Sequence, residues 1–279
     1  MQFKTLEDKC LYYRGLSDYK LLPNSYVLVM IDGRSFSHLI KNKFQKPFDD
    51  EFIRMMNETA EYVCKNVQGC KFAFVQSDEI SFVLTDFDTP TTDAFFSNRL
   101  CKMQSIIASL ATAKFNQLML SYNIERHAYD NCLFDSDNTI YSLRDAIKAI
   151  DNAQLYQFDC KCWNVPTYND VFAWFHYRQN DCIKNSKQQT AQTYLPHKEL
   201  LNKNTDEQIA LLKETKDIDW NSFTDDKKYG RFVWKEEVQF INEKGEKYVR
   251  HKWQTHNAFP LTDETNRIKF HEMNVIPKQ

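Results

Sequence analysis

Three acidic residues that could bind a metal ion lie at the ends of short apolar runs in the sequence. Asp32 follows the run 26–31, while Asp78 and Glu79 lie between the runs 71–75 and 80–84. Carboxylates gathered at one sheet edge repel each other unless a cation lies among them, and Mg²⁺ suits one or two carboxylates with water and substrate phosphates. Two such ions about 4 Å apart would hold both oxygens of a nucleotidyl transfer. The alternative is a tight turn at Asp32 and a solvated hairpin tip.

Basic side chains near these acids could hold a polyphosphate. Lys46 precedes an expected helix, and Arg99 and Lys102 lie one turn apart on a second expected helix, where both could reach a triphosphate. An Arg-x-x-Lys pair by itself is more typical of a solvated helix face. Together with Ser77 and the acidic residues, it indicates a nucleotide clamp made of side chains.

The scarcity of glycine supports a clamp of this kind. The 279 residues include five glycines, the closest two being Gly230 and Gly245. Glycine-rich phosphate loops need glycines about two to five residues apart, so neither common loop is possible. Phosphates would therefore be met by metals and side chains. Gly33, between Asp32 and Arg34, is a position where the absence of a side chain would let the carbonyl approach an ion.

Composition places the chain among folded proteins. Hydrophobic residues are 42% and charged residues 27%, which excludes disordered and fibrous proteins. The net charge of −2 means that any affinity for nucleic acid must come from local patches. No apolar run approaches the ~20 residues of a membrane span, and we expect a cytoplasmic protein. Buried reduced thiols are favoured over a zinc site, and we expect Cys160 and Cys162 to point to opposite faces of a strand.

Apolar spacing predicts the elements that position these residues. Strands are expected at 26–31, 71–75, 80–84 and 154–163, and helices from the acidic cluster at 49–51 to Val67 and over 93–120. The order βαββαβ predicts an α+β fold with a ferredoxin-like sheet and two helices on one face. The third strand would then lie antiparallel between the first two, so that Asp32 and Asp78 share one edge on strands roughly 5 Å apart.

The remainder of the chain is expected to be helical and then to form a hairpin. Helices are predicted over 169–194 and 199–214, with a short one over 143–150, and a hairpin over 231–253 turning at 243–246. We divide the chain into residues 1–165, the core, and 166–279, an extension packed on it.

Three segments carry a resemblance to a known family. Residues 30–36, 46–49 and 76–83 resemble, in order and spacing, the tRNA-histidine guanylyltransferase superfamily of reverse-direction (3′–5′) nucleotidyltransferases. The match extends through 158–159 and 177–186 and covers roughly residues 20 to 235. It implies a palm-like core, two Mg²⁺ ions and a two-step reaction. A nucleoside triphosphate first activates a tRNA 5′-monophosphate, commonly by adenylylation, and the 3′-hydroxyl of an incoming nucleotide then attacks that end.

The resemblance also implies roles for individual residues and an assembly. It implies a homotetramer built as a dimer of dimers, with tRNA and ATP or GTP as ligands. The implied catalytic residues are Asp32, Asp78 and Glu79; the implied metal ligands are Asp32, the Gly33 carbonyl and Asp78; and the implied nucleotide contacts are Arg34, Phe36, Lys46, Ser77, Arg99 and Lys102.

Departures from the family pattern indicate a branch. The family's His-Ile-Asn-Asn motif is Ile-Lys-Asn-Ser at 183–186, with Ile183 replacing the histidine. This resembles the guanylyltransferase-like branch, associated with template-dependent repair of 5′-truncated tRNA. Met30 replaces a usual arginine, which could weaken the grip on a nucleotide. The alternatives are addition of one guanosine to histidine tRNA, a palm-type enzyme acting on nucleoside triphosphate alone, and a non-catalytic RNA-binding protein.

RNA contact is expected from the later part of the chain. Residues 227–253 hold eight Lys and Arg against four acids, interleaved with aromatic residues, a pattern suited to phosphates and unpaired bases. The alternative is a half-buried hairpin whose aromatic residues belong to the core. The predicted RNA contacts are Arg178, Lys184, Asn185, Lys187, Lys227, Lys228 and Arg231.

Overall fold

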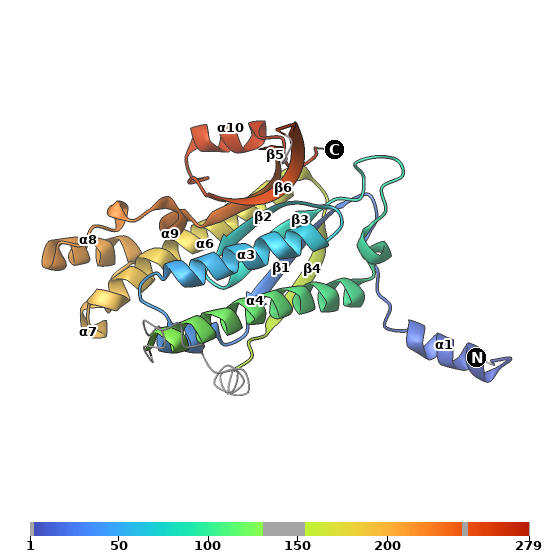
Figure 1. Ribbon diagram of the computed structural model, residues 1–279, viewed down its shortest axis with the longest axis horizontal. Coiled ribbons are helices and arrows are strands. Elements are labelled where there is room, and N and C mark those ends of the chain that lie inside the picture. The colour runs from blue at the N-terminus through green and yellow to red at the C-terminus, as the bar shows by residue number, and fades with distance from the viewer. Residues whose placement is uncertain (1–2, 131–153, 242–244, 279) are drawn as a thin grey trace.

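One antiparallel sheet organises the molecule (Figure 1). The computed structural model describes residues 3–130, 154–241 and 245–278. In it the six strands lie in the order β4-β1-β3-β2-β5-β6, and each neighbouring pair is antiparallel. Their bounds are β1 (Tyr26–Gly33), β2 (Cys70–Gln76), β3 (Glu79–Leu84), β4 (Phe158–Val165), β5 (Arg231–Ile241) and β6 (Lys247–Asn257).

The centre of the sheet has the expected strand order. β3 lies between β1 and β2 and is antiparallel to both, which makes β1 and β2 parallel to each other. These strands are continuous apolar runs rather than alternating ones because both faces of the sheet are covered, and every residue of β3 is buried. The predicted combination of helices with an antiparallel sheet is confirmed.

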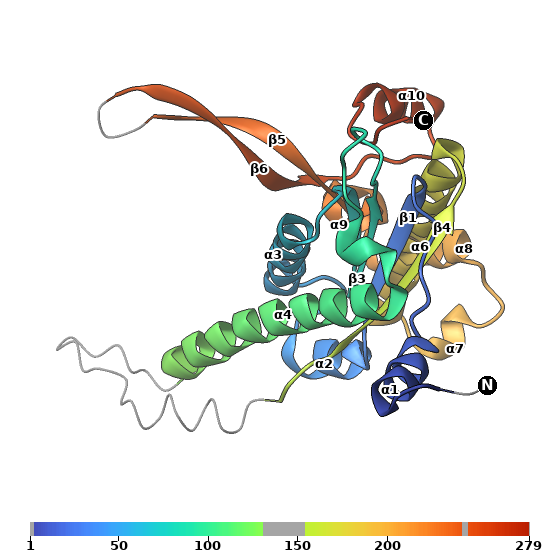
Figure 2. The ribbon, with the colours of Figure 1, turned by 90° about the vertical axis from the view of Figure 1, so that its right-hand side faces the viewer.

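Helices form a layer on each face of the sheet (Figures 1 and 2). On one face lie α3 (Asp50–Asn66) and α4 (Leu100–Asp130), and on the other lies α6 (Tyr168–Tyr194). α3 begins where predicted because the Asp49 side chain caps it, accepting a hydrogen bond of 3.0 Å from the Phe52 N–H. The capping box of Thr167 and Asp170 starts α6 in the same way.

Two helices begin later than predicted. α4 starts at Leu100 rather than near 93, because Phe96, Ser97 and Asn98 have φ between 48° and 58° and interrupt a helix. They belong to the 3₁₀ turn η1 (Phe95–Asn98). α8 (Thr205–Lys216) starts at an Asn204 capping box, after the single turn α7 (His197–Leu200). The predicted helix over 143–150 lies outside the described residues.

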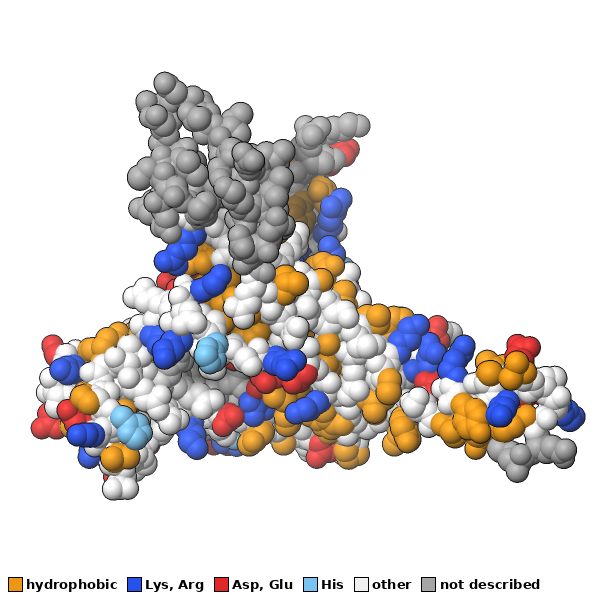
Figure 3. All heavy atoms as spheres, turned by 90° about the horizontal axis from the view of Figure 1, so that it is seen from below, with side chains coloured by type: hydrophobic (Ala, Val, Ile, Leu, Met, Phe, Trp, Pro, Cys, Tyr) orange, Lys and Arg blue, Asp and Glu red, His pale blue; other side chains and the backbone are white. Residues whose placement is uncertain are grey.

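Several elements are additions to the predicted set. α1 (Leu6–Gly15) has no buried residue and projects from the body, carrying exposed apolar side chains (Figures 1 and 3). α2 (Phe36–Lys43) lies between β1 and α3 and forms part of the site described below. The others are η2 (Trp220–Ser222), α9 (Asp225–Tyr229) and α10 (Glu264–Glu272).

The predicted C-terminal hairpin is confirmed as β5 and β6. β5 pairs with β2 from Arg231 to Trp234, so the sheet continues across the expected division at residue 165. Beyond this pairing the two strands extend away from the body as a ribbon (Figure 2). Residues 242–244 of the expected turn are outside the described residues. The two-domain division stays a prediction.

The cysteine prediction is wrong in one respect. Cys160 and Cys162 lie on the same face of β4, with their sulfur atoms 3.8 Å apart. Residues two apart on a strand share a face because side chains alternate. Cys64, Cys70, Cys162 and Cys182 are buried thiols as expected, whereas Cys10 and Cys101 are exposed.

Candidate functional site

Four acidic residues meet at one edge of the sheet. Asp32, near the end of β1, stands opposite Glu79 of β3 and, on its other side, opposite Asp159 of β4. The Gly33 N–H donates a hydrogen bond of 3.2 Å to the Asp78 carbonyl, which ties the end of β1 to the hairpin tip. The structure therefore brings Asp32, Asp78 and Glu79 together as the strand order predicts.

Asp32 and Asp78 are carboxylates in an unfavourable environment. Burial raises the pKa of Asp32, and the charges of Glu79 and Asp159 raise it further. Burial, followed by the charge of Asp32, raises the pKa of Asp78 to about 6. Within the described chain neither carboxylate forms an ion pair with a lysine or arginine. A bound cation would relieve this repulsion.

Glu79 is held differently, by a buried arginine. Arg178 of α6 forms two hydrogen bonds to its carboxylate, Nε to Oε1 at 2.8 Å and Nη2 to Oε2 at 2.5 Å. Ser81 and Gln76 also donate to Glu79. Arg178, a predicted RNA contact, is thus turned into the site with its side chain 11% exposed. We infer that Glu79 is positioned and neutralised by Arg178 rather than free to bind a metal.

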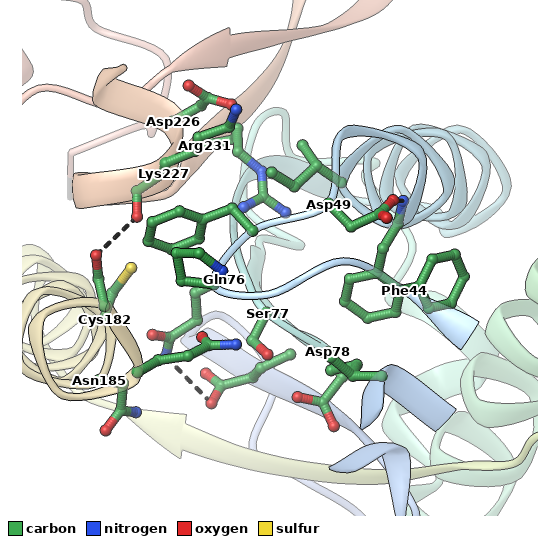
Figure 4. Close-up of a pocket in the computed structure, with 18 of the residues that line it drawn as sticks. Phe44, Asp49, Gln76, Ser77, Asp78, Cys182, Asn185, Asp226, Lys227 and Arg231 are labelled. Carbon is green, nitrogen blue, oxygen red and sulfur yellow. Dashed lines mark hydrogen bonds between the residues drawn. The ribbon is translucent and has the colours of Figure 1, made fainter. Parts of the chain in front are cut away.

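A cavity of about 570 Å³ opens beside the acidic edge (Figure 4). Phe44 and Asp49 lie on one side of it, and Asn185 and Cys182 of α6 lie on the other, with Arg231 between them. Part of its wall is apolar, and Met30 contributes where the family usually has arginine. The apolar wall consists of Ile40, Phe44, Pro47, Phe48, Phe52 and Ile53. The volume suits a nucleotide-sized ligand.

A smaller cavity of about 310 Å³ adjoins the same edge. Gly33, Lys46, Ser77 and Asp78 line it, so the predicted cation and hydroxyl for phosphate stand beside a predicted metal ligand. Ser77 has a left-handed φ of 42° at the hairpin tip, between β2 and β3. Both cavities share Ser77 and Asp78.

Phe36 lines the smaller cavity beside the acidic edge, whereas Arg34 lines neither of these two cavities. Phe36 is 1% exposed and packs in the core against Phe115 and Phe158, so it is not a free stacking surface for a base. It covers Gly33: a Cβ there would lie 2.5 Å from the Phe36 ring, which is a reason for the glycine beyond the carbonyl role predicted. Arg34 donates to Gln157 and lines a separate cavity of about 340 Å³.

Arg99 and Lys102 lie far from the acidic edge. Asn98 and Leu100 bond to Leu21 and Tyr19, just before β1 begins, whereas Asp32 lies near its end. β1 separates these two ends by roughly 15–20 Å. The helix expected to carry both residues starts later and at the opposite end of the sheet. Within one chain they do not reach the site.

The predicted RNA contacts divide into exposed and buried residues. Lys184 and Asn185 are exposed on α6, and Asn185 also lines the larger cavity. Lys187 pairs with Asp206 at 2.5 Å and Lys227 with Asp50 at 2.7 Å. Lys228 and Arg231 are instead buried, at 8% and 4% exposure. Lys228 belongs to α9 and donates to the Asn221 carbonyl beside Trp220, whereas Arg231 begins β5 and donates to Asn57 of α3.

Arg231 is buried without a carboxylate partner in the described chain. Its Nε donates to Asn57 of α3 at 2.9 Å, and its Nη2 has no hydrogen-bond partner. Burial lowers the pKa of Arg231 to about 10. It lines the larger cavity, at the side occupied by Lys227 (Figure 4).

Sequence reasoning missed three features of the site. The first is Asp159, whose place opposite Asp32 follows from the pairing of β4 with β1. The second is the pairing of Arg178 with Glu79, which joins residues ninety-nine positions apart. The third is the part of the cavity wall that α2 contributes. This helix is only eight residues long, and its apolar pattern is too short to predict a helix. The expected strand at 154–163 was the available signal for Asp159.

The acidic edge fits a hard divalent cation. The described residues contain no group of three or more His, Cys, Asp or Glu side chains placed to hold a metal. Mg²⁺ needs fewer protein ligands, since water and phosphates complete its shell. Asp32 and Asp78, two half-buried carboxylates that pair with no lysine or arginine in the described ranges, fit that requirement. None of the helices in the described part of the chain is long and apolar enough to cross a membrane.

Similarity to known proteins covers the whole described fold. A bacterial tRNA(His) guanylyltransferase (Thg1)-like protein, solved with ATP, is 28% identical, has a TM-score of 0.74, and matches over 95% of this chain and 98% of its own. The same kind of protein solved with GTP has a TM-score of 0.70 at 28% identity, covering 97% and 98%.

Curated relatives point the same way. An uncharacterized protein R259 of Acanthamoeba polyphaga mimivirus is 27% identical over 85% of this chain and 79% of its own. A probable tRNA(His) guanylyltransferase of Dictyostelium discoideum is 36% identical over 46% of this chain and about half, 48%, of its own. The family model for tRNAHis guanylyltransferase (Thg1) matches residues 9–166, more than half of the sequence. The chain belongs to the Thg1 family of tRNA(His) guanylyltransferase-like nucleotidyltransferases.

Proposed function

We propose that this protein is a Mg²⁺-dependent 3′–5′ nucleotidyltransferase that acts on the 5′ end of tRNA. Activation of a 5′-monophosphate by ATP or GTP would precede attack by the 3′-hydroxyl of the incoming nucleotide. The observation that carries the proposal is the pair Asp32 and Asp78, two carboxylates that form no ion pair with any described lysine or arginine and that line a nucleotide-sized cavity. The relatives solved with ATP and GTP support nucleotides as its ligands.

The strand order supports a palm-type catalytic core. β4-β1-β3-β2 with α3 and α4 on one face is the arrangement of a ferredoxin-like sheet. In this arrangement Asp32 and Asp78 would hold Mg²⁺ together with the Gly33 carbonyl. When bound, the metal would neutralise the polyphosphate and support an in-line displacement at phosphorus.

Other side chains would bind and orient the substrates. Lys46 and Ser77, beside Asp78 in the smaller cavity, would bind phosphate oxygens. The apolar wall of the larger cavity would hold a base and exclude water. Arg178 would keep Glu79 in place and compensate its charge, which leaves Asp32 and Asp78 as the carboxylates that face the metal.

RNA would approach along α6 and the adjoining basic residues. Lys184 and Asn185 are exposed there, Lys227 lines the larger cavity, and Lys187 lies on α6; Lys187 and Lys227 are each paired with one acid. We propose these four as RNA contacts. The dimer of dimers expected from the family would be checked by light scattering after size exclusion.

Two activities remain candidates within the family. Template-dependent repair is favoured by the residues at 183–186, which replace the family's histidine motif, and Ile183 is half-buried on α6. Addition of a single guanosine to tRNAHis is supported by the names of the relatives. A template series separates the two.

The test uses 5′-monophosphorylated tRNAs that lack one, two or three 5′ nucleotides, each incubated with single nucleoside triphosphates. Repair predicts incorporation that follows the opposing 3′ strand and stops at the restored end. Guanosine added to tRNAHis regardless of the opposing base would contradict repair. Incorporation should require Mg²⁺ and be lost in Asp78→Asn but not in Asp93→Asn, an exposed acid away from the site. Consumption of nucleoside triphosphate without RNA would indicate an enzyme of the cyclase type.

A further inference from the structure

An aromatic cluster outside both cavities joins α6 to β4, with Trp163 and Trp174 half-buried against the core and Tyr177 exposed. Trp163 of β4 packs edge-to-face against Trp174 of α6, with ring centres 4.8 Å apart. Tyr177 follows one turn along α6, at 5.8 Å from Trp174. Tyr177 is 57% exposed, although the middle of a surface helix is usually polar where it faces water. We call Trp163, Trp174 and Tyr177 the aromatic platform.

The platform is connected to the acidic edge by one side chain. The guanidinium of Arg178 lies 5.3 Å from the Tyr177 ring and 5.8 Å from the Trp174 ring. The same guanidinium forms the two hydrogen bonds to Glu79, which stands opposite Asp32 in the sheet. A group resting on the platform would therefore lie next to the site.

Exposed lysines flank the platform on both elements, and the exposed Asp159 lies on the same face of β4 as Lys161. Lys161, two residues before Trp163, is exposed, and its charge acts on Asp32. Lys184, two turns beyond Tyr177 on α6, is also exposed. Asp181 lies between Tyr177 and Lys184 along α6, and its carboxylate forms an ion pair with Arg178, Oδ2 to Nη1 at 3.1 Å. Aromatic rings flanked by lysines suit nucleobases joined by phosphates, since every base has a face that can stack.

We propose that the aromatic platform stacks an unpaired nucleobase of the RNA whose 5′ end enters the acidic edge. A 5′ end that is being extended lies beside the opposing 3′ strand, and an unpaired stretch of that strand needs a surface to hold it. Stacking is tolerant of base identity, which suits an enzyme acting on ends of different sequence. The inference rests on the proposed RNA substrate, but it concerns binding and not chemistry.

The test compares two RNA hairpins that carry a 5′-monophosphate and a four-nucleotide 3′ overhang, one with normal bases and one abasic in the overhang. Affinity is measured by fluorescence anisotropy without nucleotide or metal. The wild type should bind the normal overhang about tenfold more tightly than the abasic one. Tyr177→Ala should lose that preference while binding the abasic RNA as before, and Tyr177→Trp should keep it. Tyr194→Ala, on the same helix and 39% exposed, is the matched control.

Two further measurements identify the kind of contact that the platform makes. Quenching of tryptophan fluorescence by the normal but not the abasic RNA would support contact with Trp163 or Trp174. The salt dependence of binding should be equal in wild type and Tyr177→Ala, because phosphate contacts are unchanged. Equal loss of both RNAs in Tyr177→Ala, or no loss of either, would overturn the proposal. A change of oligomeric state in that variant would overturn it in favour of a contact between copies of the chain.

The failure of this inference is distinguishable from failure of the proposed function. If metal-dependent incorporation is absent but the overhang preference is present and lost in Tyr177→Ala, the platform stands and the activity does not. If incorporation occurs and Tyr177→Ala binds both RNAs like wild type, the activity stands and the platform does not.

Discussion

Replacing Asp78 with asparagine should make the metal-free protein more stable while abolishing catalysis. Burial and Asp32 raise the pKa of Asp78 from 3.8 to about 6, so the folded protein binds this proton more tightly than the unfolded chain. The stability contributed by the proton is therefore fully present below pH 3.8 and lost as pH rises through 6. Such a rise corresponds to at most about 3 kcal/mol, and because Asp78 is half-buried we expect ~1–3 kcal/mol.

The assay is urea unfolding at pH 4.5, 6 and 7.5 with EDTA present. Asp78→Asn should exceed wild type in free energy of unfolding at pH 7.5, and the difference should fall to about a third of that at pH 4.5, where the folded wild-type carboxyl is protonated but the unfolded one is still largely ionised. Glu214→Gln, an exposed residue of α8, controls for loss of a negative charge. Added Mg²⁺ should stabilise wild type and not Asp78→Asn. If the two proteins have equal free energies of unfolding at pH 7.5, Asp32 and Asp78 do not repel each other enough to favour cation binding.

Three further substitutions test other parts of the site. Gly33→Ala should destabilise the protein by about 1–3 kcal/mol in urea unfolding, because the new Cβ would lie 2.5 Å from the Phe36 ring. Arg178→Met should cost ~3–5 kcal/mol by leaving the Glu79 carboxylate buried and unpaired, and the double variant with Glu79→Gln should regain most of it; additive losses would refute the pairing. Arg231→Met should raise the thermal midpoint, because burial disfavours the charged guanidinium and has lowered its pKa to about 10. The same variant should bind ATP more weakly in calorimetry, because this cation lines the larger cavity. Unchanged ATP binding would show that Arg231 does not contact the nucleotide.

The central part of the fold could be predicted because its signals are local. The apolar run before Asp32, the capped start of α3 at Asp49 and the two runs around Asp78 each specify an element without help from distant residues. Strand order then follows from connection rules, and with it the meeting of Asp32 and Asp78. The late start of α4 could not be predicted. Residues 96–98 have positive φ, and a phenylalanine at the first of these positions gives no indication of that conformation.

The roles of the basic residues were harder to predict than those of the acids. Arg99 and Lys102 are spaced so that both could contact a triphosphate from one helix face. Their spacing does not show at which end of the sheet that helix begins. Arg178 and Arg231 appear in the sequence as ordinary charges, and only tertiary packing turns one onto Glu79 and buries the other beside Asn57. A cation's function depends on its partner, and partners far along the chain leave no pattern in the sequence.

The distribution of charge in the larger cavity leads to a prediction about binding order. Among the described residues, Asp32 and Asp78 form no ion pair with a lysine or arginine at one end, and Arg231 forms none with a carboxylate at the other, although Asp226 lines the same cavity. A metal ion alone satisfies the carboxylates and a triphosphate alone satisfies the guanidinium, but each then brings uncompensated charge of its own into the cavity. When both are bound, these charges compensate each other. Mg²⁺ and nucleoside triphosphate should therefore bind with positive coupling, each increasing the affinity of the other by the same factor. Titration of ATP with and without Mg²⁺ measures that factor, and equal affinities would show that the two ends of the cavity act independently.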